Sequence, residues 1–490
     1  MKTYETDIAT KQIHKGYWCI PEFSTTENFW GELEYDPETA IIELTLFGFP
    51  LLKFYKNKLT NDISIYFDCI YGNLTSGKSV TLLGAQYHQF SITDGDSLLS
   101  KISFRISDLM LGNVFFQKRK EIKFRSLSFR ITNLERWTGV TPFLHSSLKR
   151  KKQNSIHCTN PKIIQLYEDN YVKIYISSES QLTQNHCEVN STFHQKIKIT
   201  CKRNRRLPFF GESGSFLYYI SFVKSFFYLM IGRRVLLFDL KAVVKKQSHQ
   251  VPFEKNKKIL LPYSLQIFTP YLFEKIHLVK LNVDELMTVK SKLSQPLSEL
   301  FSNFIRDHHL YRDTLNIWHE VRSKSLVDEY TLSALLFCIE GLHRSLFPVF
   351  DEMPKEYAEK SADIQKTLSD IQWEFIENKI SYHCTFSKRI SEITKECKDI
   401  FPQFSSLLRR RLGKDICEKR NAVAHFRAEA GKHPIPAYLI LLLLEEFIAI
   451  LIFQHIGLKS DDLKACIAGQ KEYFFVVEKI LRWWEKKNEQ

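Results

Sequence analysis

The sequence predicts an α+β protein in which a β-rich N-terminal region precedes an all-α helical bundle. Short alternating apolar runs recur through residues 1–285 and are separated by turn residues, which is typical of strands. Over residues 286–490, apolar residues recur with helical spacing, and Pro, Gly and β-branched runs become sparse. The length of 490 residues also exceeds what a single hydrophobic core usually serves, so we expect at least two domains.

The expected elements follow from these two patterns. The alternating runs that we expect to form strands are 41–47, 63–71, 79–85, 101–106, 123–131, 171–176, 196–201 and 234–240. The polar, basic segment 149–160 falls between two of them and suggests a split of the β-rich region into two subdomains. The segments that suit helices are 297–304, 311–321, 329–346, 356–378, 386–400, 403–411, 422–429, 437–456 and 463–484.

The most apolar segment of the chain, Tyr438–Phe453, reads YLILLLLEEFIAILIF. Glu445 and Glu446 at its centre favour a buried core helix over a membrane span. Residues 1–15 are polar and charged, unlike a secretory signal. The ten cysteines show no CxxC spacing, and the residues His157, Cys158, His186, Cys187 and Cys201 do not match the usual zinc patterns. We therefore expect a cytoplasmic protein without a metal, a cofactor or a membrane partner.

The net charge of +14 falls entirely in the first region. Residues 291–490 hold 29 Lys+Arg and 29 Asp+Glu, so residues 1–290 hold the remaining 40 and 26. Basic clusters interrupt the expected strands at 118–120, 149–152, 202–206 and 255–258. Such a field favours a polyanion such as RNA or DNA. Solvated loops of an ordinary basic surface are the alternative.

A phosphate-loop pattern occurs in the β-rich region. Residues 72–79 read GNLTSGKS and match G-x-x-x-x-G-K-[ST] in full. A true phosphate loop leads from a buried strand into a helix, whereas Ser79 begins a run with strand composition. We interpret the pattern as a β-hairpin and keep a P-loop NTPase as the less favoured alternative. The triplet Asp307-His308-His309 resembles a phosphoesterase motif but lies in helical surroundings.

One segment of the helical region carries a candidate active site, with the sequence Arg420-Asn421-Ala-Val-Ala-His425. The Arg-to-His separation alone is not specific, because similar separations occur at Arg150/His157, Arg312/His319 and Arg427/His433. Only Arg420 and His425 have four residues between them and a polar Asn directly after the Arg. This combination, within the helical region, is much more specific than the spacing.

The residue types suit metal-independent RNA cleavage. We expect Arg420 just before a helix that begins at Ala422, where the helix N-terminus would favour a phosphate. Asn421 and His425 are four residues apart and would share one face. Arg420 would hold the phosphate, and Asn421 would orient the imidazole or the phosphate. His425 would act as general acid or base near neutral pH. Attack by the ribose 2′-OH would leave a 2′,3′-cyclic phosphate and spare DNA.

A structural reading of the same residues is also open. Arg420 would then pair with an acid such as Glu418, and His425 would be a packed helix histidine. The flanking basic residues, which either grip the RNA backbone or form plain surface, are Arg409, Arg410, Arg411, Lys414 and Arg427.

The helical region resembles HEPN domains, in which a polar residue usually follows the Arg and a His follows four to six positions later. Two further stretches are similar to the HEPN module of ApeA-type abortive-infection proteins: Leu335–Arg344, which reads LLFCIEGLHR, and Ile456-Gly457-Leu458. The β-rich region resembles the ApeA N-terminal domain around Ile70–Leu82 and at Ile131–Trp137.

This resemblance implies an anti-phage defence ribonuclease that damages cellular RNA. It implies self-association as a homodimer or higher oligomer, because HEPN domains typically pair their Arg/His motifs into one composite site. We expect the helix at Tyr438–Phe453 to make that pairing. Transfer RNA is the leading substrate, a phage-derived trigger is a further implied partner, and the N-terminal region would sense the trigger or position the substrate. A non-catalytic HEPN module for dimerisation or nucleic-acid binding is the alternative.

Overall fold

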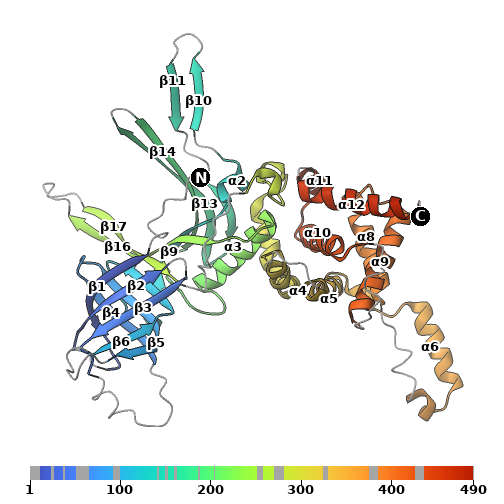
Figure 1. Cartoon of the computed structure of the whole chain (residues 1–490), viewed down its shortest axis with the longest axis horizontal. Coiled ribbons are helices and arrows are strands. Elements are labelled where there is room, and N and C mark those ends of the chain that lie inside the picture. The colour runs from blue at the N-terminus through green and yellow to red at the C-terminus, as the bar shows by residue number, and fades with distance from the viewer. Residues whose placement is uncertain are drawn as a thin grey trace. The chain divides into compact units, whose positions relative to one another are not determined.

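The structure is a computed structural model (Figure 1). It describes residues 11–23, 27–36, 39–50, 66–91, 100–140, 143–148, 153–158, 163–185, 188–203, 205–250, 258–269, 281–323, 329–374, 384–424, 435–468 and 470–488. The chain forms two compact units. One comprises residues 1–136, 140–224 and 235–280, and the other comprises residues 137–139, 225–234 and 281–490. The first is β-rich and the second is helical, so the α+β prediction is confirmed.

The first unit begins with a closed antiparallel β-barrel, drawn mainly in blue in Figure 1. Its strands pair in the order β1-β2-β3-β6-β5-β4, and β4 pairs with β1 to close the ring. Closure of this kind removes the free edges that an open sheet presents. The strands are β1 (Gln12–Cys19), β2 (Phe29–Asp36), β3 (Ile41–Phe47), β4 (Tyr66–Leu74), β5 (Ser79–Ser91) and β6 (Lys101–Arg105).

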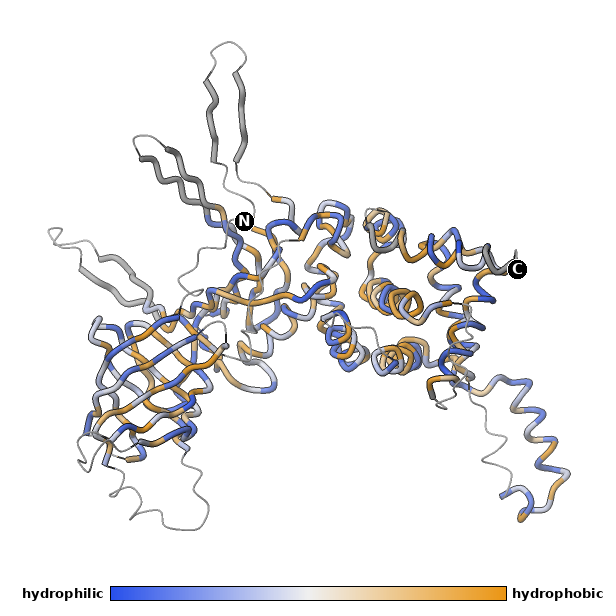
Figure 2. Tube along the Cα trace, viewed as in Figure 1, coloured by the Kyte–Doolittle hydropathy of each residue, from blue (hydrophilic) through white to orange (hydrophobic). Residues whose placement is uncertain are grey.

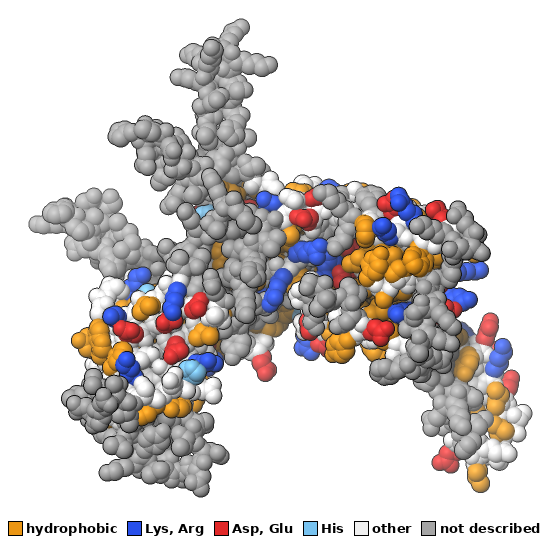
Figure 3. Space-filling model, viewed as in Figure 1, with side chains coloured by type: hydrophobic (Ala, Val, Ile, Leu, Met, Phe, Trp, Pro, Cys, Tyr) orange, Lys and Arg blue, Asp and Glu red, His pale blue; other side chains and the backbone are white. Residues whose placement is uncertain are grey.

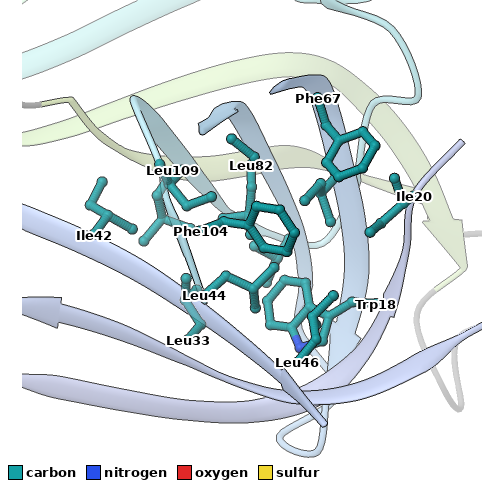
Figure 4. Packing of buried hydrophobic residues seen from close by; sticks show 14 of the residues in the cluster. Trp18, Ile20, Leu33, Ile42, Leu44, Leu46, Phe67, Leu82, Phe104 and Leu109 are labelled. Carbon is teal, nitrogen blue, oxygen red and sulfur yellow. The ribbon is translucent and has the colours of Figure 1, made fainter. Parts of the chain in front are cut away.

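Side chains fill the barrel interior. Along β2, β3 and β4 buried and less buried residues largely alternate, because successive side chains point to opposite faces of a strand. Trp18, Leu44, Phe67, Leu82 and Phe104 meet inside, and each is at most 1% exposed (Figure 4). A small barrel packed in this way has a hydrophobic core rather than a ligand cavity at its centre.

The phosphate-loop pattern forms the hairpin between β4 and β5. The turn is closed by the amide of Leu74, which donates to the carbonyl of Lys78 at 2.8 Å, and Gly77 adopts φ +80°. A Cβ on Gly72 would lie 2.4 Å from the carbonyl oxygen of Tyr17 and 2.8 Å from the Trp18 ring. The positive φ of Gly77 and the close approach at Gly72 therefore explain why both positions are glycine. The hairpin prediction is confirmed, and the helix that a P-loop NTPase requires after Ser79 is replaced by a 13-residue strand.

A second sheet continues from the barrel through β7 (Asp108–Gly112), which pairs with β5. The order runs β7-β17-β16-β9-β14-β13-β12, so strands from both sides of residues 149–160 share this sheet and one compact unit. The split of the β-rich region into two subdomains at that segment stays a prediction. The remaining strands of the sheet are β9 (Ser126–Ile131), β12 (Ile164–Glu168), β13 (Val172–Asn185), β14 (Glu188–Cys201), β16 (Leu237–Gln250) and β17 (Lys258–Phe268).

The β-rich region also contains a helix that the sequence patterns did not predict, α3 (Phe216–Ile231). Its end, together with Trp137, belongs to the helical unit. The Trp137 indole donates to Thr288 Oγ1 at 3.0 Å, and the Tyr228 hydroxyl donates to the carbonyl of His319 at 2.8 Å. The Phe226 ring packs edge-on against Phe301 at 4.9 Å.

The helical unit packs around α10 (Ala437–His455), which Figure 2 shows as a strongly hydrophobic helix. It is long and apolar enough to cross a membrane, but 14 of its 19 residues are buried inside the fold. The core-helix prediction is confirmed. That this helix pairs two copies stays a prediction. The other helices are α4 (Leu297–Ser323), α5 (Glu329–Leu346), α6 (Lys355–Thr367), α8 (Phe386–Glu396), α9 (Ser406–Ala424), α11 (Ser460–Ile467) and α12 (Lys471–Asn488).

One cluster of buried charge in this unit lies at the centre of α10. Glu445 and Glu446 are 6% and 4% exposed, and both lie beside Arg322 of α4. The Arg322 Nη1 atom lies 3.2 Å from Glu445 Oε2 and 3.6 Å from Glu446 Oε1. A buried carboxylate needs such a partner, because desolvation without one costs several kcal/mol.

Candidate functional site

Arg420 and Asn421 lie in the last turns of α9, which runs from Ser406 to Ala424. The prediction of a helix that begins at Ala422 is therefore wrong. The helix continues through the polar stretch because Leu412, Ile416 and Lys419 recur on one buried face. Arg420 follows the first residue of this helix by 14 positions, so the N-terminal amides of the same helix are too far away to help it hold a phosphate.

The guanidinium of Arg420 is surrounded by groups from three helices. Its Nη2 lies 3.8 Å from Glu340 Oε2 of α5, and its Nη1 lies 3.5 Å from Asn421 Oδ1. The Phe386 ring, at the start of α8, lies 5.5 Å from the guanidinium carbon. The Arg420 side chain keeps 31% of its surface exposed. It is thus held loosely, by one long ion pair and one long hydrogen bond, and remains accessible to a ligand.

Glu340 is the carboxylate that Arg420 contacts, and sequence reasoning did not single it out. Glu340 also accepts a 2.9 Å hydrogen bond from Arg344, one turn further along α5. Glu418, the partner that the structural reading proposed, lies 3.7 Å from Lys414 instead. The signal that could have found Glu340 is its place in the segment LLFCIEGLHR, which carried part of the family resemblance.

The helix that begins beside Arg420 is α8. Thr385 caps it by accepting a hydrogen bond from the amide of Lys388 at 3.3 Å. The positive end of the α8 dipole therefore lies near Arg420 and adds to the attraction for an anion. The helix start near Arg420 therefore belongs to α8 and not to the helix that carries the motif.

A buried network fixes α8 against α5. Arg389 is 1% exposed, its Nη1 lies 3.2 Å from His343 Nδ1, and its Nη2 donates to Asp351. Burial and the adjacent Arg389 lower the pKa of His343 to about 4. His343 is therefore neutral at pH 7 and packs inside the fold. Its role is to position α5, which carries Glu340.

The flanking basic residues divide into two groups. Arg409 donates to the carbonyl of Phe404 at 2.8 Å, and the Arg411 guanidinium lies 5.4 Å from the Trp484 ring centre, so both take part in packing. Arg410, Lys414 and Asn421 are exposed and fall on one face of α9 at 100° per residue. His425 and Arg427 lie outside the described residues, and their placement stays a prediction.

Other candidate chemistry finds no site among the residues that the structure describes. Within them no three His, Cys, Asp or Glu side chains gather in a way that could hold a metal ion. Asp307 pairs with Arg306 and His455 on the surface of α4, and burial lowers the pKa of His308 to about 4, so the phosphoesterase-like triplet is helical packing. His157 and Cys158 lie on a hairpin whose side chains are not described.

A cavity of about 450 Å³ lies in the helical unit, and none of the motif residues line it. Arg322, which lines it, is paired with Glu445 and Glu446. Gln470 donates to the carbonyl of Met287 at 2.6 Å. The polar groups of this cavity thus serve the fold, and the cavity is separate from the residues around Arg420.

A β-rich unit that precedes a helical unit with an exposed Arg-Asn pair defines a protein with a HEPN-type module. Two family models match the chain: ApeA N-terminal domain 1 over residues 13–283 and Apea-like HEPN over residues 335–462. The chain therefore belongs to the ApeA family and is a HEPN nuclease-type protein of anti-phage defence. No curated protein and no solved structure matches it.

Proposed function

We propose that this protein is a metal-independent endoribonuclease that cleaves cellular RNA. The observation that carries the proposal is the environment of Arg420. Its guanidinium is partly exposed, only loosely paired with Glu340, and lies beside the exposed Asn421 within the HEPN match. A planar guanidinium suits a phosphate that binds through two oxygens. The start of α8 adds a favourable dipole.

The proposed reaction is an internal transfer. The 2′-oxygen of the ribose attacks the neighbouring phosphorus, and the bond from phosphorus to the 5′-oxygen breaks. His425 takes the proton from the 2′-OH, and an acid returns a proton to the leaving 5′-oxygen. Arg420 stabilises the charge on the phosphorane, and Asn421 orients the phosphate or the imidazole. The products are a 2′,3′-cyclic phosphate and a 5′-OH.

A homodimer would complete such a site, because the second copy's His425 would supply the acid. The pairing surface is then sought on exposed residues near Arg420 rather than on the buried α10. Transfer RNA is our leading substrate. We further propose that the enzyme acts in the cytoplasm and is released by a phage-derived trigger.

A second candidate is a non-catalytic HEPN module that serves dimerisation or nucleic-acid binding. The observation that favours it is the same Glu340–Arg420 pair, which also links α5 to α9 as a structural ion pair would. The two candidates differ in what His425 does. Loss of its imidazole abolishes function only if the module is an enzyme.

The test is RNA cleavage in EDTA at high protein concentration, with total tRNA, messenger RNA and ribosomal RNA as substrates. We expect wild type to leave cyclic phosphate ends, and His425→Ala and Arg420→Ala to lose about 10²–10⁴-fold of the rate. The matched controls are His309→Ala and Arg312→Ala, whose side chains lie on the surface of α4. Specific activity should fall on dilution if two copies form the site.

Each outcome decides between the candidates. Equal cleavage by wild type and His425→Ala would assign the activity to another site or a contaminant. If neither protein cuts, both are compared in phage-infected cells. Equal protection there supports the non-catalytic candidate, and loss of protection in His425→Ala supports a nuclease that needs its trigger.

A further inference from the structure

Two basic segments that are distant in the sequence lie together in the first unit. Residues 118–125 and 202–206 are joined by the short strands β8 (Lys123–Phe124) and β15 (Leu207–Pro208), which pair antiparallel. The amide of Phe209 donates to the carbonyl of Ile122 at 3.1 Å, and that of Cys201 donates to the carbonyl of Arg125 at 2.9 Å. Backbone hydrogen bonds thus fix the two segments side by side.

The joined segments carry nine basic side chains and one acidic residue, Glu121. Arg119 lies 3.7 Å from Asp68, and Lys202 lies 2.7 Å from Glu168. The others form no ion pair with a carboxylate in the described part of the chain. We call these nine residues the β8–β15 basic patch: Lys118, Arg119, Lys120, Lys123, Arg125, Lys202, Arg203, Arg205 and Arg206.

Aromatic rings accompany these cations. Tyr171 is 53% exposed, and the Arg205 guanidinium lies 5.4 Å from its ring centre. The Arg119 guanidinium lies 4.1 Å from the centre of the Phe210 ring. The amide of Lys202 donates to the carbonyl of Tyr171 at 2.8 Å, which fixes that aromatic residue beside the basic segment.

Among the described residues of this unit, several other basic side chains are neutralised. Lys196 and Lys198 pair with Glu179, and Lys241 pairs with Asp239. On the face shown in Figure 3, basic and acidic side chains are interspersed over the barrel. In the same unit, Lys11 pairs with Glu34 and Lys15 pairs with Glu32. Within the part of this unit that the structure describes, the β8–β15 basic patch therefore gathers the largest group of basic side chains without a carboxylate partner.

We infer that the β8–β15 basic patch binds the phosphate backbone of single-stranded RNA. Five of its nine cations are arginines, whose planar forks suit phosphate oxygens. Proteins that bind single strands without sequence preference combine such a field with aromatic platforms on which bases stack, and Tyr171 provides an exposed ring. This inference goes beyond the proposed cleavage reaction, because it assigns an RNA-binding surface to the β-rich unit and does not depend on His425.

The test measures binding without cleavage. Full-length protein with His425→Ala is titrated against a fluorescein-labelled oligouridine at several salt concentrations. The patch variant adds Lys123→Gln, Arg205→Gln and Arg206→Gln. The matched control instead adds Lys15→Gln, Lys78→Gln and Lys101→Gln, which removes the same charge from the barrel. Circular dichroism establishes that both variants are folded.

We expect the patch variant to bind at least tenfold more weakly and to lose about 2 from the slope of log affinity against log salt, at about 0.7 per phosphate contact. The control should change less than twofold. Tyr171→Ala, which leaves the charge intact, should weaken binding by about fivefold or more. Equal losses in patch variant and control, or no loss in the patch variant, would overturn the inference. Equal competition by polyglutamate would also overturn it and indicate an acidic protein as the partner. None of these results bears on cleavage by the HEPN unit.

Discussion

Replacing Glu340 by Gln tests whether the ion pair restrains Arg420 before substrate binds. The change removes the charge of the carboxylate that lies 3.8 Å from Arg420 and keeps its shape and much of its hydrogen bonding. A phosphate that binds to Arg420 must compete with Glu340 for the guanidinium. We therefore expect Glu340→Gln to strengthen substrate binding.

The size of the effect follows from the geometry. Coulomb's law gives about 4 kcal/mol for two unit charges at this distance and an effective dielectric constant of 20, whereas exposed pairs measure about 0.2–1 kcal/mol. Glu340 and Arg420 are 16% and 31% exposed, and Glu340 is shared with Arg344. We take about 1 kcal/mol for the Glu340–Arg420 interaction, which corresponds to roughly a fivefold change in the affinity for substrate.

The assay is steady-state cleavage of a short oligoribonucleotide at constant salt. We expect KM to fall about fivefold while kcat changes little, because the reacting groups are untouched. Glu418→Gln is the control, because it removes the same charge two residues from Arg420. Glu418 itself pairs with Lys414. A rise in KM, or a loss of kcat, would refute the reasoning and show that Glu340 positions Arg420 for catalysis.

Two further predictions concern stability. Arg322→Met should lower the free energy of unfolding by about 3–5 kcal/mol, because Glu445 and Glu446 stay buried without this cation. Replacing Glu445 and Glu446 by Gln in the same variant should recover most of the loss. An unchanged urea midpoint in Arg322→Met would contradict this prediction. The pKa of His343 is about 4 in the folded protein, below its ordinary 6.5, so an unfolded chain takes up the proton first as pH falls. The stability present above pH 6.5 should decline towards pH 4, by up to about 3 kcal/mol from this group. In a plot of the urea midpoint against pH, His343→Gln should flatten this part of the curve. A wild-type curve without the decline would speak against the burial of His343.

Local patterns predicted many elements because the local signal and the tertiary environment agree. The expected segments 41–47 and 329–346 match β3 and α5 at both ends. In each, one face is buried and the other is less so, and the sequence shows that difference as a period of two or of 3.6. The expected helices at 297–304 and 311–321 are in fact one helix, α4, because the polar residues between them do not interrupt the backbone.

Helix α3 was missed for the opposite reason. Its sequence, FLYYISFVKSFFYLMI, is apolar and aromatic on nearly all sides, so it shows no helical period and has strand-like composition. Burial on most sides permits such a helix, but nothing local reveals it. The same limit explains the sheet order, in which β7 joins strands that are far apart in the chain.

The residues of the candidate site were proposed from the sequence and stay a prediction, whereas the contacts around Arg420 could not be proposed from the sequence. The Arg-Asn pair was found from its type and spacing, and the structure shows Arg420 partly exposed beside Asn421. Its partner Glu340 is 80 residues earlier in the sequence, and the nearby helix start belongs to α8. Contacts between helices cannot be deduced from the pattern of one helix, so these two features required the fold.

The barrel core has a consequence for the order in which the protein is made. Phe268 of β17 belongs to the same buried cluster as Trp18 and Leu44, so this core is complete only when residue 268 has left the ribosome. Arg420 follows 152 residues later. At about 5–20 residues per second, roughly 8–30 s separate the two events. The N-terminal unit can therefore fold before the proposed nuclease motif has been synthesised.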